Sequence, residues 1–215
     1  MRIRIQIFFG PSWRELGEYL EGAHAHAKRL LPYFVLGAFS GIRTDEFEEL
    51  RWGNVRPAQK IIRATSAVSK TGEPRSVPIH PTLAAWLEVL PRGKDDEKIV
   101  PTTFEAMRRR LRDKLNRKRK AKLPWPANAL RHSFGSYRYR ETLSLEKTSD
   151  EMRHSDPKLF RKHYLNPDVN EEMAKEYWSL VPSKVLDLDP PKKKKAKTTP
   201  TRTDSRKKSA KRGKK

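Results

Sequence analysis

The sequence contains no cysteine and no long uninterrupted run of apolar residues. The absence of cysteine excludes disulfide bonds and thiolate metal ligands. Residues 1–10 place two arginines before a short apolar stretch, which is too short and too polar for a signal peptide. No later segment resembles the roughly 20 apolar residues that a membrane-spanning helix requires. We therefore expect a cytoplasmic or nucleoid-associated protein without a membrane partner.

Acidic residues are scarce relative to basic ones. The chain has 48 Lys and Arg against 26 Asp and Glu, a formal net charge of +22. Such an excess favours a polyanionic partner, most simply nucleic acid. Residues 192–215 hold 13 of the basic residues and one acidic residue, so the remaining chain keeps 35 basic and 25 acidic residues. The folded part is therefore expected to be basic as well.

The length of 215 residues suits one domain with a substantial core, followed by a tail. From Pro190 onward the composition is dominated by Lys, Thr, Ser and Pro, which offer little to bury. The sequence predicts a folded domain over residues 1–183 and a disordered basic tail over residues 184–215. We find no internal repeat.

Apolar periodicity predicts a mostly helical domain. A capping box at Ser12–Glu15 predicts the start of one helix. The apolar run 30–39, stopped by Ser40-Gly41, predicts a second helix that is buried. Thr44 is expected to cap a third helix, with Phe47 and Leu50 facing inward. Apolar spacing predicts further helices over 82–90, 104–115, 128–140 and 170–180. The last of these could pack in the domain's own core or dock on a neighbouring molecule.

Two short segments, 61–64 and 76–79, have the composition of β-strands. Lys70 lies in the turn region between them, next to Thr71-Gly72. Together with the helices, these segments predict a mainly α fold with a small antiparallel β-sheet.

Four short segments carry side chains suited to one reaction. They are G-I-R-T-D-E with Arg43, S-K-T-G-E-P-R with Lys70, N-A-L-R-H-S-F-G with Asn128 and Arg131, and H-S-D-P-K-L-F-R-K-H-Y with His154 and Tyr164. Phosphoryl transfer builds negative charge on the non-bridging oxygens, which two arginines can hold through forked hydrogen bonds. A tyrosine, with a pKa near 10, needs such cationic neighbours to act as a nucleophile at neutral pH.

The order and spacing of these segments resemble the catalytic domain of the tyrosine recombinases, the phage-integrase family. The resemblance runs from about Leu30 to about Pro182. It implies the catalytic-domain fold of that family, and cleavage and rejoining of DNA strands through a 3′-phosphotyrosyl intermediate. Such a reaction would serve site-specific recombination or DNA integration by a mobile element. Because the covalent link conserves the energy of the broken bond, no ATP, metal or other cofactor is expected.

The resemblance also implies partners and individual roles. The partners are double-stranded DNA and further copies of the chain on paired DNA sites, with no small-molecule substrate. The implied roles are Tyr164 as nucleophile, Arg43 and Arg131 as phosphate clamp, Lys70 as general acid toward the leaving 5′ oxygen, and His154 and Asn128 as hydrogen-bond donors.

Neighbouring residues compete for some of these roles. Tyr164 is preferred over tyrosines inside helical patterns, because it lies at a predicted helix end ten residues after His154. His163 is expected to be a spectator. Lys60 and Lys94 are weaker rivals of Lys70. The lesser candidate Glu46 matches an acidic position that orients the site, and the acidic residues around it are expected to be helix-dipole partners rather than a metal site.

The chain departs from the family pattern at three places. Asn128 stands where the family usually has a histidine, and an amide cannot shuttle a proton at neutral pH. Arg153 stands where the family usually has glycine, which is costly if the backbone needs a positive φ there. Only 42 residues precede Arg43. We therefore expect the separate N-terminal domain that completes the DNA clamp to be missing.

Three other functions remain open from the sequence. The chain could be a catalytically inactive DNA-binding remnant of the same fold. It could be a nucleoid-type architectural protein that acts through its basic tail. A monomeric topoisomerase would use the same chemistry. Taken one by one, the arginines could also belong to a basic surface, Lys70 to a solvated turn and Tyr164 to ordinary packing.

Overall fold

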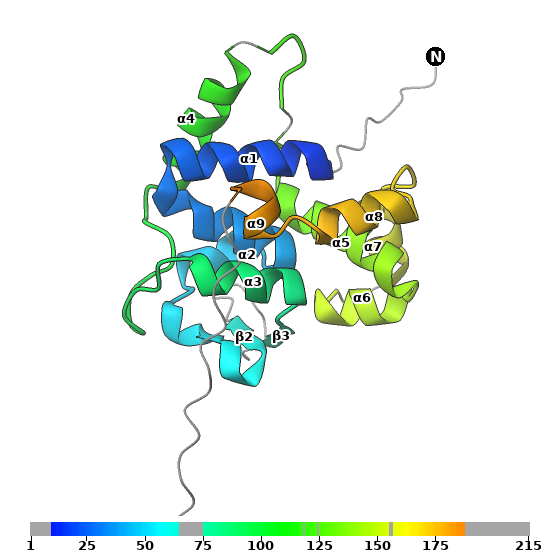
Figure 1. Cartoon of the computed structure of the whole chain (residues 1–215). Coiled ribbons are helices and arrows are strands. Elements are labelled where there is room, and N and C mark those ends of the chain that lie inside the picture. Colours follow the sequence, from blue (N-terminus) through cyan, green and yellow to red (C-terminus); the bar gives the residue numbers. More distant parts are fainter. Residues whose placement is uncertain (1–9, 65–74, 118, 124, 155–156, 188–215) are drawn as a thin grey trace, which may run out of the picture.

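The computed structural model describes residues 10–64, 75–117, 119–123, 125–154 and 157–187. The predicted fold class is confirmed, because the domain is mainly helical and has a small antiparallel sheet at one edge (Figure 1). The α-helices are α1 (Trp13–His26), α2 (Leu31–Ser40), α3 (Pro81–Val89), α4 (Phe104–Asn116), α5 (Ala129–Thr142), α6 (Leu145–Glu151), α7 (Pro157–Tyr164), α8 (Glu171–Trp178) and α9 (Pro182–Val185). In the described part of the chain, no helix is long and apolar enough to cross a membrane.

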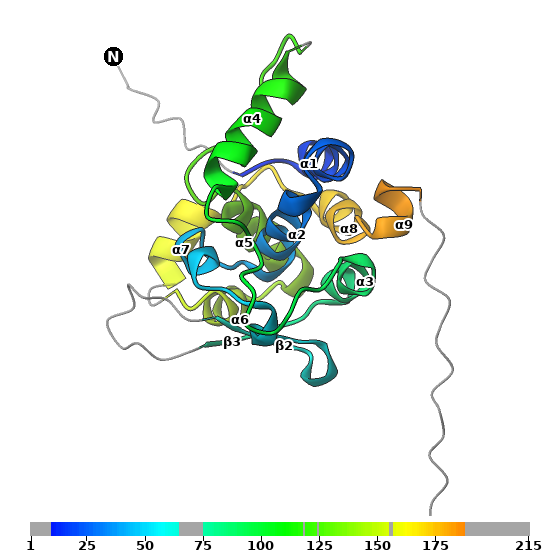
Figure 2. The same cartoon turned by 90° about the vertical axis from the view of Figure 1, so that its left-hand side faces the viewer.

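Helix α2 is the centre of the main core. All ten of its residues are buried, and it packs against α1, α3 and α5 (Figures 1 and 2). It ends at Gly41, whose φ of 65° lies in the left-handed region that glycine enters without strain. The side chain of Phe134 on α5 closes over this glycine. The end of α2 is therefore held against the helix that carries Arg131.

The sheet is a small antiparallel unit at the lower edge of the molecule in Figure 1. Its strands are β1 (Val55–Arg56), β2 (Ile61–Ala64) and β3 (Arg75–Pro78), paired in that order. Residues of β3 alternate between buried and exposed, so Arg75 and Val77 face inward. An arginine at an inward position needs a buried partner. Lys70 falls in residues 65–74, outside the described residues.

Helices α5, α6 and α7 enclose a second, smaller core of Phe134, Met152 and Phe160. The sequence did not predict α6, a seven-residue helix in which Leu145 is the one apolar residue. Its start is capped by Ser144, whose side chain accepts a hydrogen bond from the backbone N–H of Lys147.

Near the two ends of the domain, the structure confirms one prediction and decides one open alternative. The capping box at Ser12 is present at the start of α1, as predicted. In α8, Tyr177 is fully buried and stacks on Tyr137 at a ring-centroid distance of 4.0 Å, so this helix packs in the domain's own core. The predicted domain boundary at residue 183 falls inside α9. Residues 188–215, most of the predicted tail, lie outside the described residues.

The predicted cap at Thr44 is wrong. The segment Asp45–Glu48 forms a single 3-10 turn, η2, and the Thr44 side chain makes no capping bond to it. Phe47 and Leu50 are buried as expected. Glu46, within this turn, points into the protein rather than toward solvent, with 1% of its side chain exposed.

Glu46 forms a buried ion pair that joins η2 to β3. Its two carboxylate oxygens accept hydrogen bonds from Arg75 Nε at 3.0 Å and Arg75 Nη2 at 2.8 Å, and from the backbone N–H of Arg43 at 2.7 Å. Burial by itself raises the pKa of Glu46, but the hydrogen bonds and charge of Arg75 and Arg43 outweigh it and hold the pKa below its usual value. The carboxylate is therefore ionised at neutral pH.

Replacing this carboxylate should destabilise the fold in a pH-dependent way. Glu46→Gln leaves Arg75 buried without a counter-charge, which should lower the free energy of unfolding at pH 7 by about 3 kcal/mol. Because the folded-state pKa of Glu46 is lowered, its contribution is full above its usual pKa of about 4.5 and is lost as the pH falls through the folded-state value. Urea unfolding of both proteins at pH 7 and at pH 3 measures the difference. An equal difference at both pH values would contradict the role of the charge.

Candidate active site

Three arginines converge on the C-terminal end of α6. They donate to the three consecutive carbonyl groups of residues 151–153, which the helix leaves without intrahelical partners. Arg75 Nη1 lies 2.9 Å from the first carbonyl oxygen, Arg131 Nη2 lies 2.5 Å from the second, and Arg43 Nη2 lies 3.1 Å from the third. Arg43 and Arg131 come from segments 88 residues apart in the chain, and this turn brings them together.

Arg131 is the most deeply placed of the three, with 1% of the residue exposed. It leaves α5 and donates through Nη1 to the carbonyl oxygen of Gly41 at 2.5 Å. Burial lowers its pKa to about 10, and the positive charge of Arg43 adds to this effect, so the guanidinium stays charged at neutral pH. Its Nε is buried and has no hydrogen-bond partner among the described residues. A guanidinium has five N–H groups, so Arg131 keeps donors for an anionic ligand.

Tyr164 is the last residue of α7 and is half-buried beside these cations. The guanidinium carbon of Arg131 lies 5.6 Å from the centroid of its ring. The ring of His132 stacks on it at 4.5 Å, and the ring of His154 meets it edge-on at 5.3 Å. The nucleophile candidate therefore lies between two imidazoles and next to the buried arginine.

Ser136 ties the end of α7 to α5. Its Oγ donates to the backbone carbonyl of Tyr164 at 2.7 Å and accepts from the N–H of Asn166 at 2.9 Å. The backbone that carries Tyr164 is thus bonded to the same helix as Arg131.

His154 follows the turn that the arginines hold. Its backbone N–H donates to the carbonyl of Ser149 at 2.9 Å, and Ser149 Oγ returns a bond of the same length to the His154 carbonyl. Arg153, just before it, has a φ of 48°. This position therefore does need the positive φ that glycine adopts freely, and an arginine here costs about 1 kcal/mol.

Asn128 lies at the start of α5 with a φ of 52°, a region that asparagine tolerates better than most residues. Its Oδ1 accepts a hydrogen bond from the backbone N–H of Thr44 at 3.3 Å. The amide oxygen thus holds the segment after Arg43, and the amide nitrogen is the donor that remains for a ligand.

The structure brings together five of the six predicted site residues, and the sixth, Lys70, lies outside the described residues. The side chain of His163 is also outside them, while Lys60 and Lys94 are exposed in turns. Sequence reasoning missed Arg75 and His132. Arg75 is the last residue of the segment that contains Lys70, and His132 directly follows Arg131. Their positions in these segments were the available signals.

The chain is similar to known proteins in sequence and in fold. Residues 15–171 match the phage integrase family. No curated protein sequence matches the chain significantly. Among solved structures, the XerA recombinase is 18% identical, with a TM-score of 0.58, 80% of this chain covered and 65% of that one.

Two further solved structures share the fold. The Tn1549 transposon integrase, in complex with transposon right end DNA, is 15% identical with a TM-score of 0.56 and covers 81% of this chain and 67% of that one. The catalytic domain of the bacteriophage HP1 integrase is 19% identical with a TM-score of 0.52, and 72% and 87% of the two chains are covered. The chain thus spans about two thirds of the first two proteins and most of the HP1 catalytic domain. Since the family match extends over most of its length, this chain belongs to the phage integrase family, the tyrosine recombinases.

Proposed function

We propose that this protein cleaves and rejoins DNA strands through a 3′-phosphotyrosyl intermediate, in site-specific recombination or DNA integration. The observation that carries the proposal is the buried guanidinium of Arg131, which is fixed by two carbonyl oxygens and lies beside the ring of Tyr164. A fixed cation next to a tyrosine is the arrangement that attack on a phosphodiester requires.

The arginines are suited to hold the scissile phosphate. Arg131 has a fixed orientation and a buried Nε–H that is not used within the described residues. Arg43 is more accessible, with 32% of its side chain exposed, and its bond to a backbone carbonyl can be exchanged for one to phosphate oxygen. Donors that are oriented before the reaction stabilise developing charge without a cost of reorganisation.

Tyr164 would supply the attacking oxygen. Its hydroxyl releases its proton to solvent and forms a bond to phosphorus, and the bond from phosphorus to the 5′ oxygen breaks. His154 and the amide of Asn128 would donate hydrogen bonds to the phosphate. Lys70 would protonate the leaving 5′ oxygen, a role that rests on the resemblance. The reverse attack by a 5′ hydroxyl rejoins a strand and frees the tyrosine.

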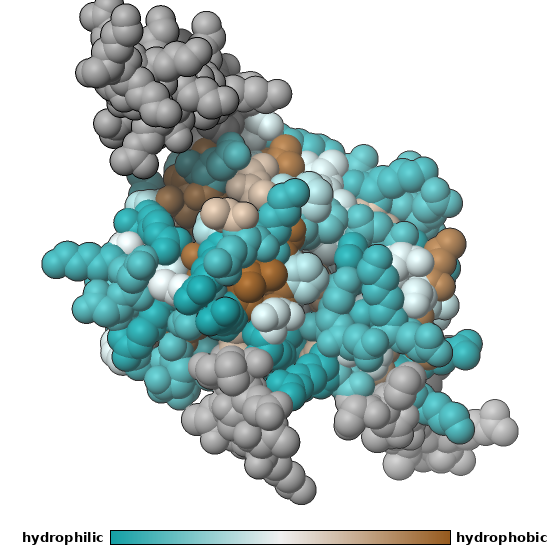
Figure 3. All heavy atoms as spheres, turned by 90° about the horizontal axis from the view of Figure 1, so that it is seen from below, coloured by the Kyte–Doolittle hydropathy of each residue, from teal (hydrophilic) through white to brown (hydrophobic). Residues whose placement is uncertain are grey.

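Double-stranded DNA is the proposed partner, and helix α4 offers a basic surface for it. Helix α4, which projects from the body in Figure 1, packs on α1 and carries exposed basic side chains along its length. These are Arg109, Arg110, Lys114 and, just after the helix, Arg117. The side of the molecule away from α4, seen from below in Figure 3, is also mostly hydrophilic among the described residues. Solved relatives include the lambda integrase bound to DNA.

Recombination would further require several copies on paired sites, whereas a monomer that relaxed supercoils would be a topoisomerase.

A second candidate is a catalytically inactive DNA-binding protein of the same fold. Two observations favour it: Asn128 replaces a residue that can transfer protons, and Arg153 adopts a strained backbone conformation just before His154. The two candidates differ in whether a covalent protein–DNA adduct forms.

Tyr164→Phe should abolish the covalent adduct, because phenylalanine has no oxygen to attack phosphorus. A nicked suicide substrate traps the adduct, which survives boiling in detergent and is counted on a denaturing gel. Tyr139→Phe on α5 is the matched control and should form the adduct at the parent rate. We expect the reaction to run in EDTA. An adduct with the Tyr164→Phe protein would mean that another residue is the nucleophile, and no adduct with the parent would favour the inactive candidate.

Asn128→His combined with Arg153→Gly should speed the reaction. Glycine removes the strain at a φ of 48° and keeps the backbone carbonyl that Arg43 contacts. Histidine restores proton transfer, and general acid–base help is typically about 10²–10⁴ in rate. Single-turnover adduct formation should therefore rise, while DNA affinity measured by fluorescence anisotropy stays within about twofold of the parent. A double mutant no faster than the parent would show that neither residue limits the reaction.

A further inference from the structure

Glu151, the last residue of α6, is held by two arginines at once. Its backbone carbonyl accepts from Arg75, as described above. Its two carboxylate oxygens accept from Nε and Nη2 of Arg138, each at 2.7 Å. A carboxylate at a helix C-terminus is disfavoured by the helix dipole. Arg138 compensates for that charge with a bidentate pair, the geometry in which arginine binds carboxylate most specifically.

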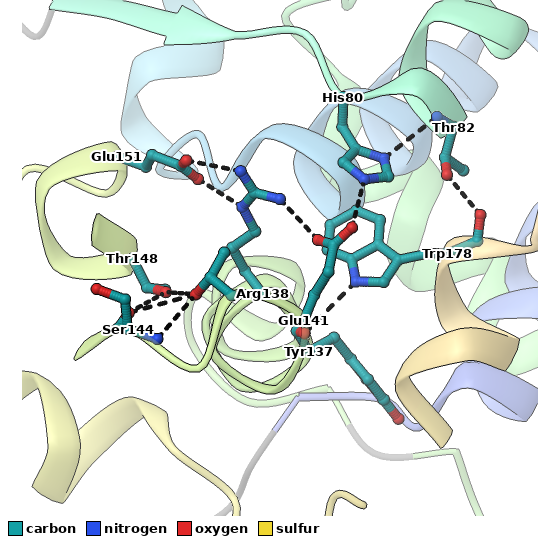
Figure 4. Close-up of polar contacts among 10 residues, drawn as sticks. His80, Thr82, Tyr137, Arg138, Glu141, Ser144, Thr148, Glu151 and Trp178 are labelled. Carbon is teal, nitrogen blue, oxygen red and sulfur yellow. Dashed lines mark hydrogen bonds and ion pairs between the residues drawn. The ribbon is translucent and has the colours of Figure 1, made fainter. Parts of the chain in front are cut away.

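Arg138 also holds a second carboxylate on the opposite side. Its Nη1 donates to Glu141 at 2.6 Å, and the other oxygen of Glu141 lies 3.0 Å from His80 Nε2. His80 Nδ1 accepts the backbone N–H of Thr82 at the start of α3, so Nε2 is the nitrogen that donates to Glu141. Figure 4 shows Arg138 between the two carboxylates, with His80 beyond Glu141. The hydrogen bonds that Arg138 donates to Glu151 are the largest cause that raises the pKa of Arg138 above its usual value.

The spacing along α5 relates this network to the active site. Arg131 and Arg138 are seven residues apart, which is nearly two full turns, so both leave α5 on the same side. Arg131 reaches the backbone of the turn 151–153, and Arg138 reaches the side chain of its first residue. The turn is thus bonded to α5 at two positions along that helix. Arg131 belongs to the proposed phosphate site, whereas the Glu151 side chain that Arg138 binds lies outside that site.

We infer that Arg138 is a positioning residue of the active site. By holding Glu151 against α5, it fixes the three carbonyl groups that orient Arg43, Arg75 and Arg131. It also fixes the turn that leads into His154. Arg138 itself does not touch the scissile phosphate. The catalytic consequence rests on the proposed function, but the positioning of the turn does not.

The first measurement concerns the turn in the DNA-free protein. Arg138→Gln should speed hydrogen exchange of the amides of Arg153 and His154 about tenfold, because their bonds to Asp150 and Ser149 close the turn. Arg140→Gln is the matched control: Arg140 lies on the same helix and has no ion pair within the described residues, so it should change nothing. Unchanged exchange in Arg138→Gln would overturn the inference, whether or not the protein cleaves DNA.

The second measurement separates positioning from general damage to the fold. On an ordinary suicide substrate, Arg138→Gln should slow single-turnover adduct formation about tenfold or more, with DNA affinity within about twofold of the parent. A second substrate carries a methyl group in place of one non-bridging oxygen of the scissile phosphate. The arginines then have less negative charge to stabilise, so Arg138→Gln should reduce the rate by a smaller factor. An equal loss on both substrates would show that Arg138 does not act through the arginine pair.

Arg138→Lys is a second variant, to be used in case Arg138→Gln does not fold. Lysine keeps the positive charge but cannot hold both oxygens of Glu151 and a second carboxylate with one planar fork. It should slow the ordinary substrate as Arg138→Gln does, with urea unfolding close to the parent. A parental rate in the lysine variant would overturn the inference. If the parent itself forms no adduct, the proposed function fails, and the hydrogen-exchange result still decides whether Arg138 holds the turn.

Discussion

The candidate site depends on the unpaired carbonyl groups at the end of one short helix. Three guanidinium groups would repel one another in an interior of low dielectric unless negative charge lay between them. The C-terminus of α6 supplies partial negative charge at residues 151–153, and Glu46 supplies a full charge beside Arg75. These acceptors let Arg43, Arg75 and Arg131 lie close together before any phosphate arrives. The cationic centre is therefore a product of the fold, not of composition alone.

Much of the helical framework could be predicted because its signals are local. The capping box at Ser12, the apolar run that becomes α2 and the glycine that ends it are all encoded within a few residues. The site residues could be placed in order along the chain because the segments around them are distinctive. The glycine that the family usually has at position 153 raised the question of a positive φ there, and the structure answers it with a φ of 48° at Arg153.

What could not be predicted depends on contacts between distant segments. The resemblance matched Glu46 to an acidic position that orients the site, but its buried partner, Arg75, lies 29 residues away and could not be identified from the local pattern. Arg75 escaped notice because its burial depends on strand register. The short helix α6 has too few apolar residues for a periodic signal, and its place is set by its packing on α5 and α7. Such tertiary contacts override propensity.

The two bonds of Ser136 have a mechanical consequence. They fasten the backbone around Tyr164 to α5, a helix that is buried along most of its length. If a DNA strand becomes joined to the Tyr164 oxygen, tension along that strand passes through the tyrosine backbone into α5 rather than lifting α7 from the surface. The load would be borne by the centre of the domain, next to Arg131, so the broken strand end and the groups that must reseal it would stay in register under force.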